Sequence, residues 1–131
     1  MKITKDMKTI KPEHPYADLL GLIIKSKSDG KCTCSIAFGK TLLNPNGVVH
    51  GGAIYSMADT GMGGALSSTL QEDQLCATIE IKIMYLKPAG HFDLVCYSEL
   101  IKKGRRVAFL ESEVYSNDKL IAKASGSFAI F

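Results

Sequence analysis

The sequence contains no apolar run long enough to span a bilayer. The run DLLGLII near the N-terminus is far shorter than the ~20 residues that a spanning helix needs, and no small-residue cleavage site follows it. Charge of one sign is also scarce, because the formal net charge is only +3 and the basic residues are spread along the chain. General nucleic-acid binding requires a denser basic block. These absences indicate a cytoplasmic protein without a membrane or nucleic-acid partner, and they favour an anionic small ligand.

Cysteine and proline are equally sparse, with four of each in the chain. No two cysteines have the C-x-x-C spacing of a metal site, so no metal is expected. The cysteines lie in or beside segments that read as strands, which predicts reduced thiols in an apolar core: Cys32, Cys34, Cys76 and Cys96. With 46% hydrophobic and 22% charged residues, the composition is that of a globular chain and not of a disordered or fibrous one.

The chain of 131 residues is long enough for one hydrophobic core and too short for two ordinary domains. Residues 1–14 show no sustained period, and the stretch KPEHPY at residues 11–16 carries two prolines that prevent a regular element there. We therefore expect an N-terminal arm over residues 1–14 and a single domain over residues 15–131. The next segment, ADLLGLIIKS, reads equally well as a short helix or as the lead into a strand. No internal repeat or low-complexity segment is visible.

Periodicity predicts the remaining elements. The segment KCTCSIAF alternates as a strand does, and the apolar residues between positions 51 and 68 recur at one, three and four positions, as on a helix. Four further β segments follow: CATIEIKIMYL, HFDLVCYSELIKK, RRVAFLESEVYS and KLIAKASGSFAIF. In the first of them, alternation sets Thr78 and Ile81 on opposite faces. The connections KPAG, KKGR and SNDK have hairpin length, so consecutive strands should be antiparallel neighbours in an α+β domain.

The expected helix begins with two glycines and carries an acidic residue away from its apolar stripe. On a helical wheel Asp59 lies well over 90° from the middle of that stripe, beside Gly52 and Gly63. Gly51 and Gly52 would leave the first backbone N–H groups of the helix uncovered by side chains. Those groups form an oxyanion hole when a carbonyl oxygen sits against them.

The string NPNGVVHGGAIYSMADT resembles the signature of hotdog-fold acyl-CoA thioesterases of the PaaI-type, THEM2-like branch. It holds an Asn, a Gly, a His-Gly-Gly and an Asp nine residues after the His, and the likeness extends from about Tyr16 through IKIMYLKPA and GRRVAFLESEV. The resemblance implies an antiparallel sheet of five or six strands wrapped around one long central helix. It also implies hydrolysis of acyl-CoA thioesters without a cofactor, since coenzyme A is part of the substrate.

The resemblance also implies roles for single residues. The catalytic acid corresponds to Asp59, acting as general base or nucleophile, and the donor that polarises the carbonyl corresponds to the Gly51 N–H. The remaining motif positions are Asn44, which would orient water or substrate, His50, an orienting hydrogen-bond group, and Thr78, at the start of the next strand. Arg105 and Arg106, in the expected KKGR hairpin, are our candidates for the CoA phosphates because arginine suits bidentate phosphate contact.

Eight residues of helix separate Asp59 from Gly51 by ~12 Å, too far for both to act on one thioester from the same chain. The resemblance implies how this gap is closed, by a homodimer with shared active sites, expected to pair into a homotetramer.

Other interpretations remain open for each of these features. The glycines would also permit tight packing, Asn44 would form a turn beside Pro45, and Thr78 suits a strand by its shape. Dehydration or hydration of an acyl thioester is a second possible reaction, although no D-x-N-x-H arrangement is present. A non-enzymatic acyl-CoA-binding or regulatory protein is a third reading. The acyl group is not specified by the sequence.

Overall fold

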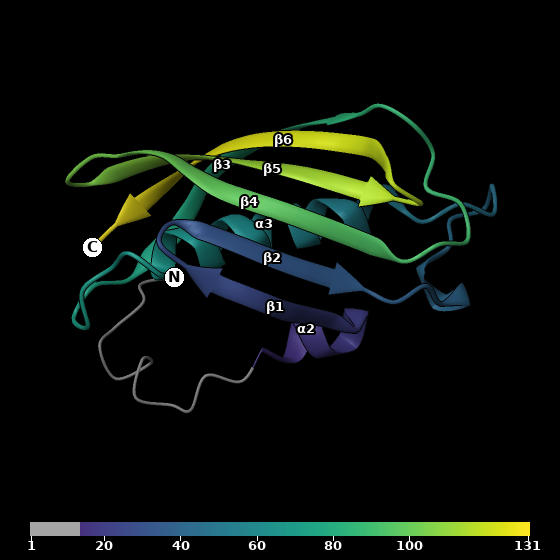
Figure 1. Ribbon diagram of the computed structural model, residues 1–131, viewed down its shortest axis with the longest axis horizontal. Coiled ribbons are helices and arrows are strands. Elements are labelled where there is room, and N and C mark those ends of the chain that lie inside the picture. Colours follow the sequence, from purple (N-terminus) through teal and green to yellow (C-terminus); the bar gives the residue numbers. More distant parts are fainter. Residues whose placement is uncertain (1–13) are drawn as a thin grey trace.

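In the computed structural model, a six-stranded antiparallel sheet curves around one long helix, α3 (Figure 1). The structure describes residues 14–131, so the expected N-terminal arm lies outside the described residues except for His14. The elements in chain order are α2 (Pro15–Leu20), β1 (Leu22–Ser28), β2 (Lys31–Ile36), the short 3-10 helix η1 (Lys40–Leu42), α3 (Gly51–Ser67), β3 (Cys76–Tyr85), β4 (Leu94–Lys103), β5 (Val107–Ser116) and β6 (Lys119–Ile130). Within this range no helix has the length and apolar character needed to cross a membrane.

The segment that reads both as helix and as strand contains one of each. Pro15 occupies the first turn of α2, where its missing N–H costs nothing and its fixed φ suits the helix. Gly21 ends α2 with a left-handed φ of 71°, and β1 begins at the next residue.

The strand order is β1-β2-β4-β5-β6-β3, which makes one sequence prediction wrong. β4, β5 and β6 are consecutive antiparallel neighbours as expected, but β3 pairs with β6 and not with β4. The connection from β3 to β4 is hydrogen-bonded to the loop that leads into α3, since the Val49 N–H donates to the Ala89 carbonyl at 3.1 Å. A short connection with Pro and Gly therefore crosses the end of the sheet here instead of turning back on itself.

A β-bulge in β3 changes which of its side chains face the helix. Thr78 pairs with Phe128 and Glu80 pairs with Ser127, so Ile79 is an extra residue that shifts the register. Thr78 consequently shares the inner face of the sheet with Ile81, whereas simple alternation would set the two on opposite faces. Ile79 is left 54% exposed.

The core lies between α3 and the concave face of the sheet. The apolar stripe of α3 is buried as its 3.6-residue period predicts, with Met57 and Met62 fully buried, and Asp59 lies off this stripe. All four cysteines are free thiols, and three of them are buried core residues: Cys32, Cys34 and Cys96. Cys76 is only partly buried.

Two glycines of α3 differ sharply in the space around them, which gives a stability prediction. A Cβ on Gly61 would overlap the Ser98 hydroxyl, which is held 2.6 Å from the Ser112 hydroxyl in the core. A Cβ on Gly63 would meet nothing nearer than the Phe128 ring at 3.8 Å. We expect Gly61→Ala to lower the free energy of unfolding by about 1–3 kcal/mol through overpacking.

Gly63→Ala is the matched control, because it makes the same substitution two residues later on the same helix. It should leave stability unchanged or raise it by up to ~1 kcal/mol through helix propensity. Denaturant unfolding of both variants measures the difference, and equal effects would contradict the packing seen at Gly61.

Candidate active site at the start and middle of α3

The helix start is capped by the imidazole of His50. His50 is the N-cap residue, and its Nδ1 accepts a hydrogen bond from the Gly52 N–H at 2.7 Å. A Cβ on Gly52 would lie only 2.8 Å from this Nδ1, so the glycine makes room for the cap. The expectation that both glycine amides are open is therefore wrong for Gly52, whose amide is covered by its own chain.

The amide of Gly51 differs, because no acceptor within residues 14–131 bonds to its N–H. The ring of Tyr85 lies against this glycine, with its nearest atoms 3.1–3.2 Å from the position of a Cβ. The Tyr85 hydroxyl donates to the Gly51 carbonyl at 2.9 Å, and burial, followed by the nearby Tyr55, raises the pKa of Tyr85. Gly51 thus presents an available donor at the positive end of a 17-residue helix.

Gly51 lines a hollow of about 340 Å³ together with Asn44, Ile54 and Lys87. The side chain of Asn44 organises the loop that leads into the helix, since its Oδ1 accepts from the N–H groups of Asn46 at 2.9 Å and Val48 at 3.3 Å. The interpretation of Asn44 as a turn former is therefore correct. The same turn holds Asn44 at the rim of the Gly51 hollow.

Asp59 is held by Thr78, the residue that the bulge in β3 turns inward. The Thr78 hydroxyl donates to Asp59 Oδ1 at 2.7 Å, and Asp59 as a residue is partly buried. The pair lines a second hollow of about 380 Å³, the Asp59 hollow, between the two edge strands of the sheet: Ile24 and Lys27 of β1, Gly63 of α3 and Cys76 of β3 also line it. Burial, and then the negative charge of Asp59, raises the pKa of the Cys76 thiol.

One chain therefore brings Asp59 and Thr78 together and keeps them apart from Gly51. The two groups line different hollows, and the eight residues of α3 between Gly51 and Asp59 rise by ~12 Å. A carbonyl oxygen in hydrogen-bond contact with the Gly51 amide has its carbon out of reach of the Asp59 of the same chain.

Arg105 and Arg106 lie in the exposed turn between β4 and β5 and line neither hollow. This end of the sheet lies beside the end of α3, because Lys103 Nζ donates to the Thr69 carbonyl at 2.8 Å. Within one chain the two arginines are therefore at the opposite end of the helix from Gly51.

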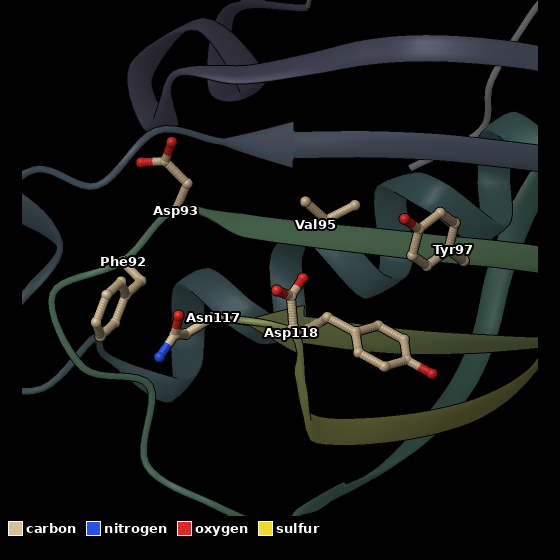
Figure 2. Close-up of a pocket in the computed structure, with 7 residues that line it drawn as sticks. Phe92, Asp93, Val95, Tyr97, Asn117 and Asp118 are labelled. Carbon is tan, nitrogen blue, oxygen red and sulfur yellow. The ribbon is translucent and has the colours of Figure 1, made fainter.

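A third hollow, of about 540 Å³, lies on the outer face of the sheet (Figure 2). It is lined by aromatic and acidic residues of β4, β5 and the adjoining loops, with Tyr97 and Tyr115 packed edge to face. Asp93 has a structural role, since its Oδ1 accepts a hydrogen bond from the Phe38 N–H at 2.7 Å. Gly51 is not among the residues that line this hollow, so the hollow lacks that amide as a donor.

Sequence reasoning missed two residues at these hollows. Tyr85 reads only as an alternating strand residue, and its contact with Gly51 depends on the position of the edge strand β3 across α3. Lys27 reads as an ordinary strand lysine, and nothing local indicates that it lines the hollow of Asp59.

Comparison with known proteins agrees with this architecture. A model of the thioesterase superfamily matches residues 46–123. The solved structure of conserved protein PA5202 from Pseudomonas aeruginosa is similar, with a TM-score of 0.87 and 36% identity over 91% of this chain and 95% of that one. A phenylacetic acid degradation-related protein from Ralstonia eutropha gives 0.84 and 25%, over 95% and 96%. YigI, a medium/long-chain acyl-CoA thioesterase of Escherichia coli, is 28% identical over 97 residues, 63% of each chain.

These likenesses confirm the resemblance to PaaI-type proteins and the hotdog arrangement of sheet and helix. They support thioester hydrolysis as the general reaction. Since the matched family model runs from the loop before α3 into β6 and covers more than half of the residues, the chain belongs to the thioesterase superfamily.

Proposed function

We propose that this protein hydrolyses acyl-CoA thioesters to the free acid and CoA. The observation that carries the proposal is the Asp59 carboxylate, which is held by Thr78 at the edge of a hollow and lies outside the core stripe of its own helix. A carboxylate with one oxygen fixed by a hydroxyl is oriented for proton transfer or nucleophilic attack.

Thr78 donates to Oδ1 and leaves Oδ2 to act on the substrate. As a general base, Oδ2 takes a proton from the water that attacks the thioester carbon, and the proton passes to the leaving CoA thiolate. As a nucleophile, the same oxygen attacks the thioester carbon and the C–S bond breaks, so the CoA thiolate leaves, takes a proton from water and leaves a mixed anhydride on Asp59. Water then hydrolyses the anhydride to the free acid and regenerates the carboxylate. In both routes the Gly51 N–H donates to the developing oxyanion.

The donor and the carboxylate come from different protomers of a homodimer in this proposal. β3 supplies the surface for pairing, since it is an edge strand of ten residues with half-exposed apolar side chains at Ile79, Met84 and Tyr85. Long apolar edges of this kind pair readily with a second chain. A two-fold axis beside β3 would bring the Asp59 face of one α3 toward the start of the other. We expect two such dimers to form a homotetramer.

The same dimer gives Arg105 and Arg106 their proposed role. Because they lie at the end of α3 in their own chain, an antiparallel partner helix would set them near the Gly51 hollow of the other protomer. There they would bind the phosphates of CoA, which needs no further cofactor. The four free cysteines favour the cytoplasm as the location.

A panel of acyl-CoA esters, assayed by detection of the free thiol, tests the function. We expect release of CoA from at least one ester class at rates well above spontaneous hydrolysis, with kcat in the range of about 1–1,000 per second. Saturable binding of acyl-CoA without any release of thiol would instead identify a non-enzymatic acyl-CoA-binding protein.

A further inference from the structure

A lysine lines the Asp59 hollow beside the proposed catalytic carboxylate. Lys27 lies near the end of the edge strand β1, and its Cδ is 3.6 Å from the position that a Cβ on Gly64 would occupy. Its aliphatic stem therefore packs across the glycine surface of α3, five residues beyond Asp59. Packing of the stem restricts where the ammonium group can lie.

The ammonium of Lys27 has no acidic partner in the part of the chain that the structure describes. The carboxylates within 4.0 Å of a lysine there belong to Glu111 and Glu113, which both face Lys123. The positive charge of Lys27 is nevertheless felt in the hollow. Burial and the Asp59 charge raise the pKa of Cys76, and the charge of Lys27 partly offsets this increase. The hollow thus has a negative group toward β3 and an unmatched positive group toward β1.

The rest of the lining is mainly apolar or small, with Ile24, Gly63 and Phe128 among its residues. We propose that the hollow takes an acyl group that ends in a carboxylate, with its thioester carbon at Asp59 and its distal carboxylate on the Lys27 ammonium. This inference rests on the proposed function and specifies the substrate class for the same site. A charge-assisted hydrogen bond between carboxylate and ammonium would select such acyl groups over neutral ones.

Lys27 is placed to contact the acyl end of the substrate and not the CoA phosphates. Lys27 and Asp59 line one hollow of about 380 Å³, and Gly64 lies only ~7.5 Å beyond Asp59 along the helix axis. The pantetheine arm holds the phosphates many bonds away from the thioester, whereas a short dicarboxylic acyl chain spans this distance. Glutaryl and adipoyl groups are suitable probes.

The test compares kcat/KM for glutaryl-CoA with pentanoyl-CoA, and for adipoyl-CoA with hexanoyl-CoA, which match in chain length. We expect the wild-type protein to prefer the dicarboxylic member of each pair by about tenfold or more, as a charged hydrogen bond provides. Lys27→Met should lower this ratio by about tenfold, and Lys27→Arg should retain most of the preference. Lys25→Met is the matched control, because Lys25 lies on the same strand and does not line this hollow.

Two results would overturn the inference: no dicarboxylic preference in the wild type, or an equal loss with both members of a pair in Lys27→Met. The second result would mean that Lys27 contacts the CoA moiety or has only a structural role.

A binding measurement separates this inference from the proposed function. In the Asp59→Asn background, calorimetry should show glutaryl-CoA binding about tenfold tighter than pentanoyl-CoA, and Lys27→Met should remove the difference. If the panel shows no hydrolysis while this binding preference holds, the function fails and the subsite stands; if the preference is also missing, both fail.

Discussion

Replacing Asp59 with Asn is expected to lower kcat for acyl-CoA hydrolysis by at least ~100-fold, the usual loss when an acid-base group is removed. The amide keeps the size of the carboxyl group and its oxygen can still accept from Thr78, so the fold should be retained. It can neither take a proton from water nor attack the thioester carbon. Steady-state assays with the best ester of the panel measure the effect, with circular dichroism and light scattering to check folding and assembly.

Thr78→Val is the graded companion of this variant, because valine keeps the β-branched shape and removes only the hydroxyl. Loss of the 2.7 Å hydrogen bond frees the carboxylate to rotate, and we expect a smaller decrease in kcat, of about tenfold. Full turnover in Asp59→Asn would remove this carboxylate from the mechanism. A larger loss in Thr78→Val than in Asp59→Asn would assign the chemistry to Thr78 instead.

Gly51→Pro is expected to lower kcat by about 100- to 1,000-fold, because it removes the backbone N–H that would hold the oxyanion. Proline suits the first residue of a helix, and His50, with φ −59° and ψ 134°, already has the backbone conformation that a following proline requires. Gly51→Ala is the control, since it adds a Cβ at the same tight position beside Tyr85 but keeps the amide. Equal activities of the two variants would exclude an oxyanion role for Gly51.

Mixing the Asp59→Asn protein with the Gly51→Pro protein tests whether the active site is shared between protomers. If Asp59 and Gly51 act from different protomers, a dimer of one Asp59→Asn chain and one Gly51→Pro chain has one site with both groups intact. Random exchange should therefore restore roughly a quarter of the wild-type activity. Absence of recovery, with subunit exchange verified by mass spectrometry, would count against a composite site.

The sequence predicted the features that depend on local periodicity. The bounds of α3 and the position of Asp59 off its apolar stripe follow from a period of 3.6 residues, which needs no knowledge of the rest of the chain. The antiparallel order of β4, β5 and β6 follows in the same way from two short turns.

Features that depend on distant contacts were not predictable in this way. The length of the connection after β3 does not distinguish a hairpin from a crossing, and hydrogen bonds such as that from Val49 to Ala89 decide between them. The acceptor that caps the Gly52 amide comes from a side-chain rotamer of His50, and the Tyr85 hydroxyl that donates to the Gly51 carbonyl comes from a strand residue 34 positions later. The position of Lys27 likewise depends on how β1 lies against α3.

The bulge at Ile79 has a consequence for how this chain can tolerate change. Many side chains would fit at that position, because it is mostly exposed and its role is to be an additional residue in the strand. Deleting it would set Thr78 and Ile81 two positions apart, so regular alternation alone would keep both on the inner face and the pairing with β6 would run on without a shift. The pairing of β3 with β6 on both sides of the bulge, and not the extra residue itself, sets the Thr78 hydroxyl against the Asp59 carboxylate.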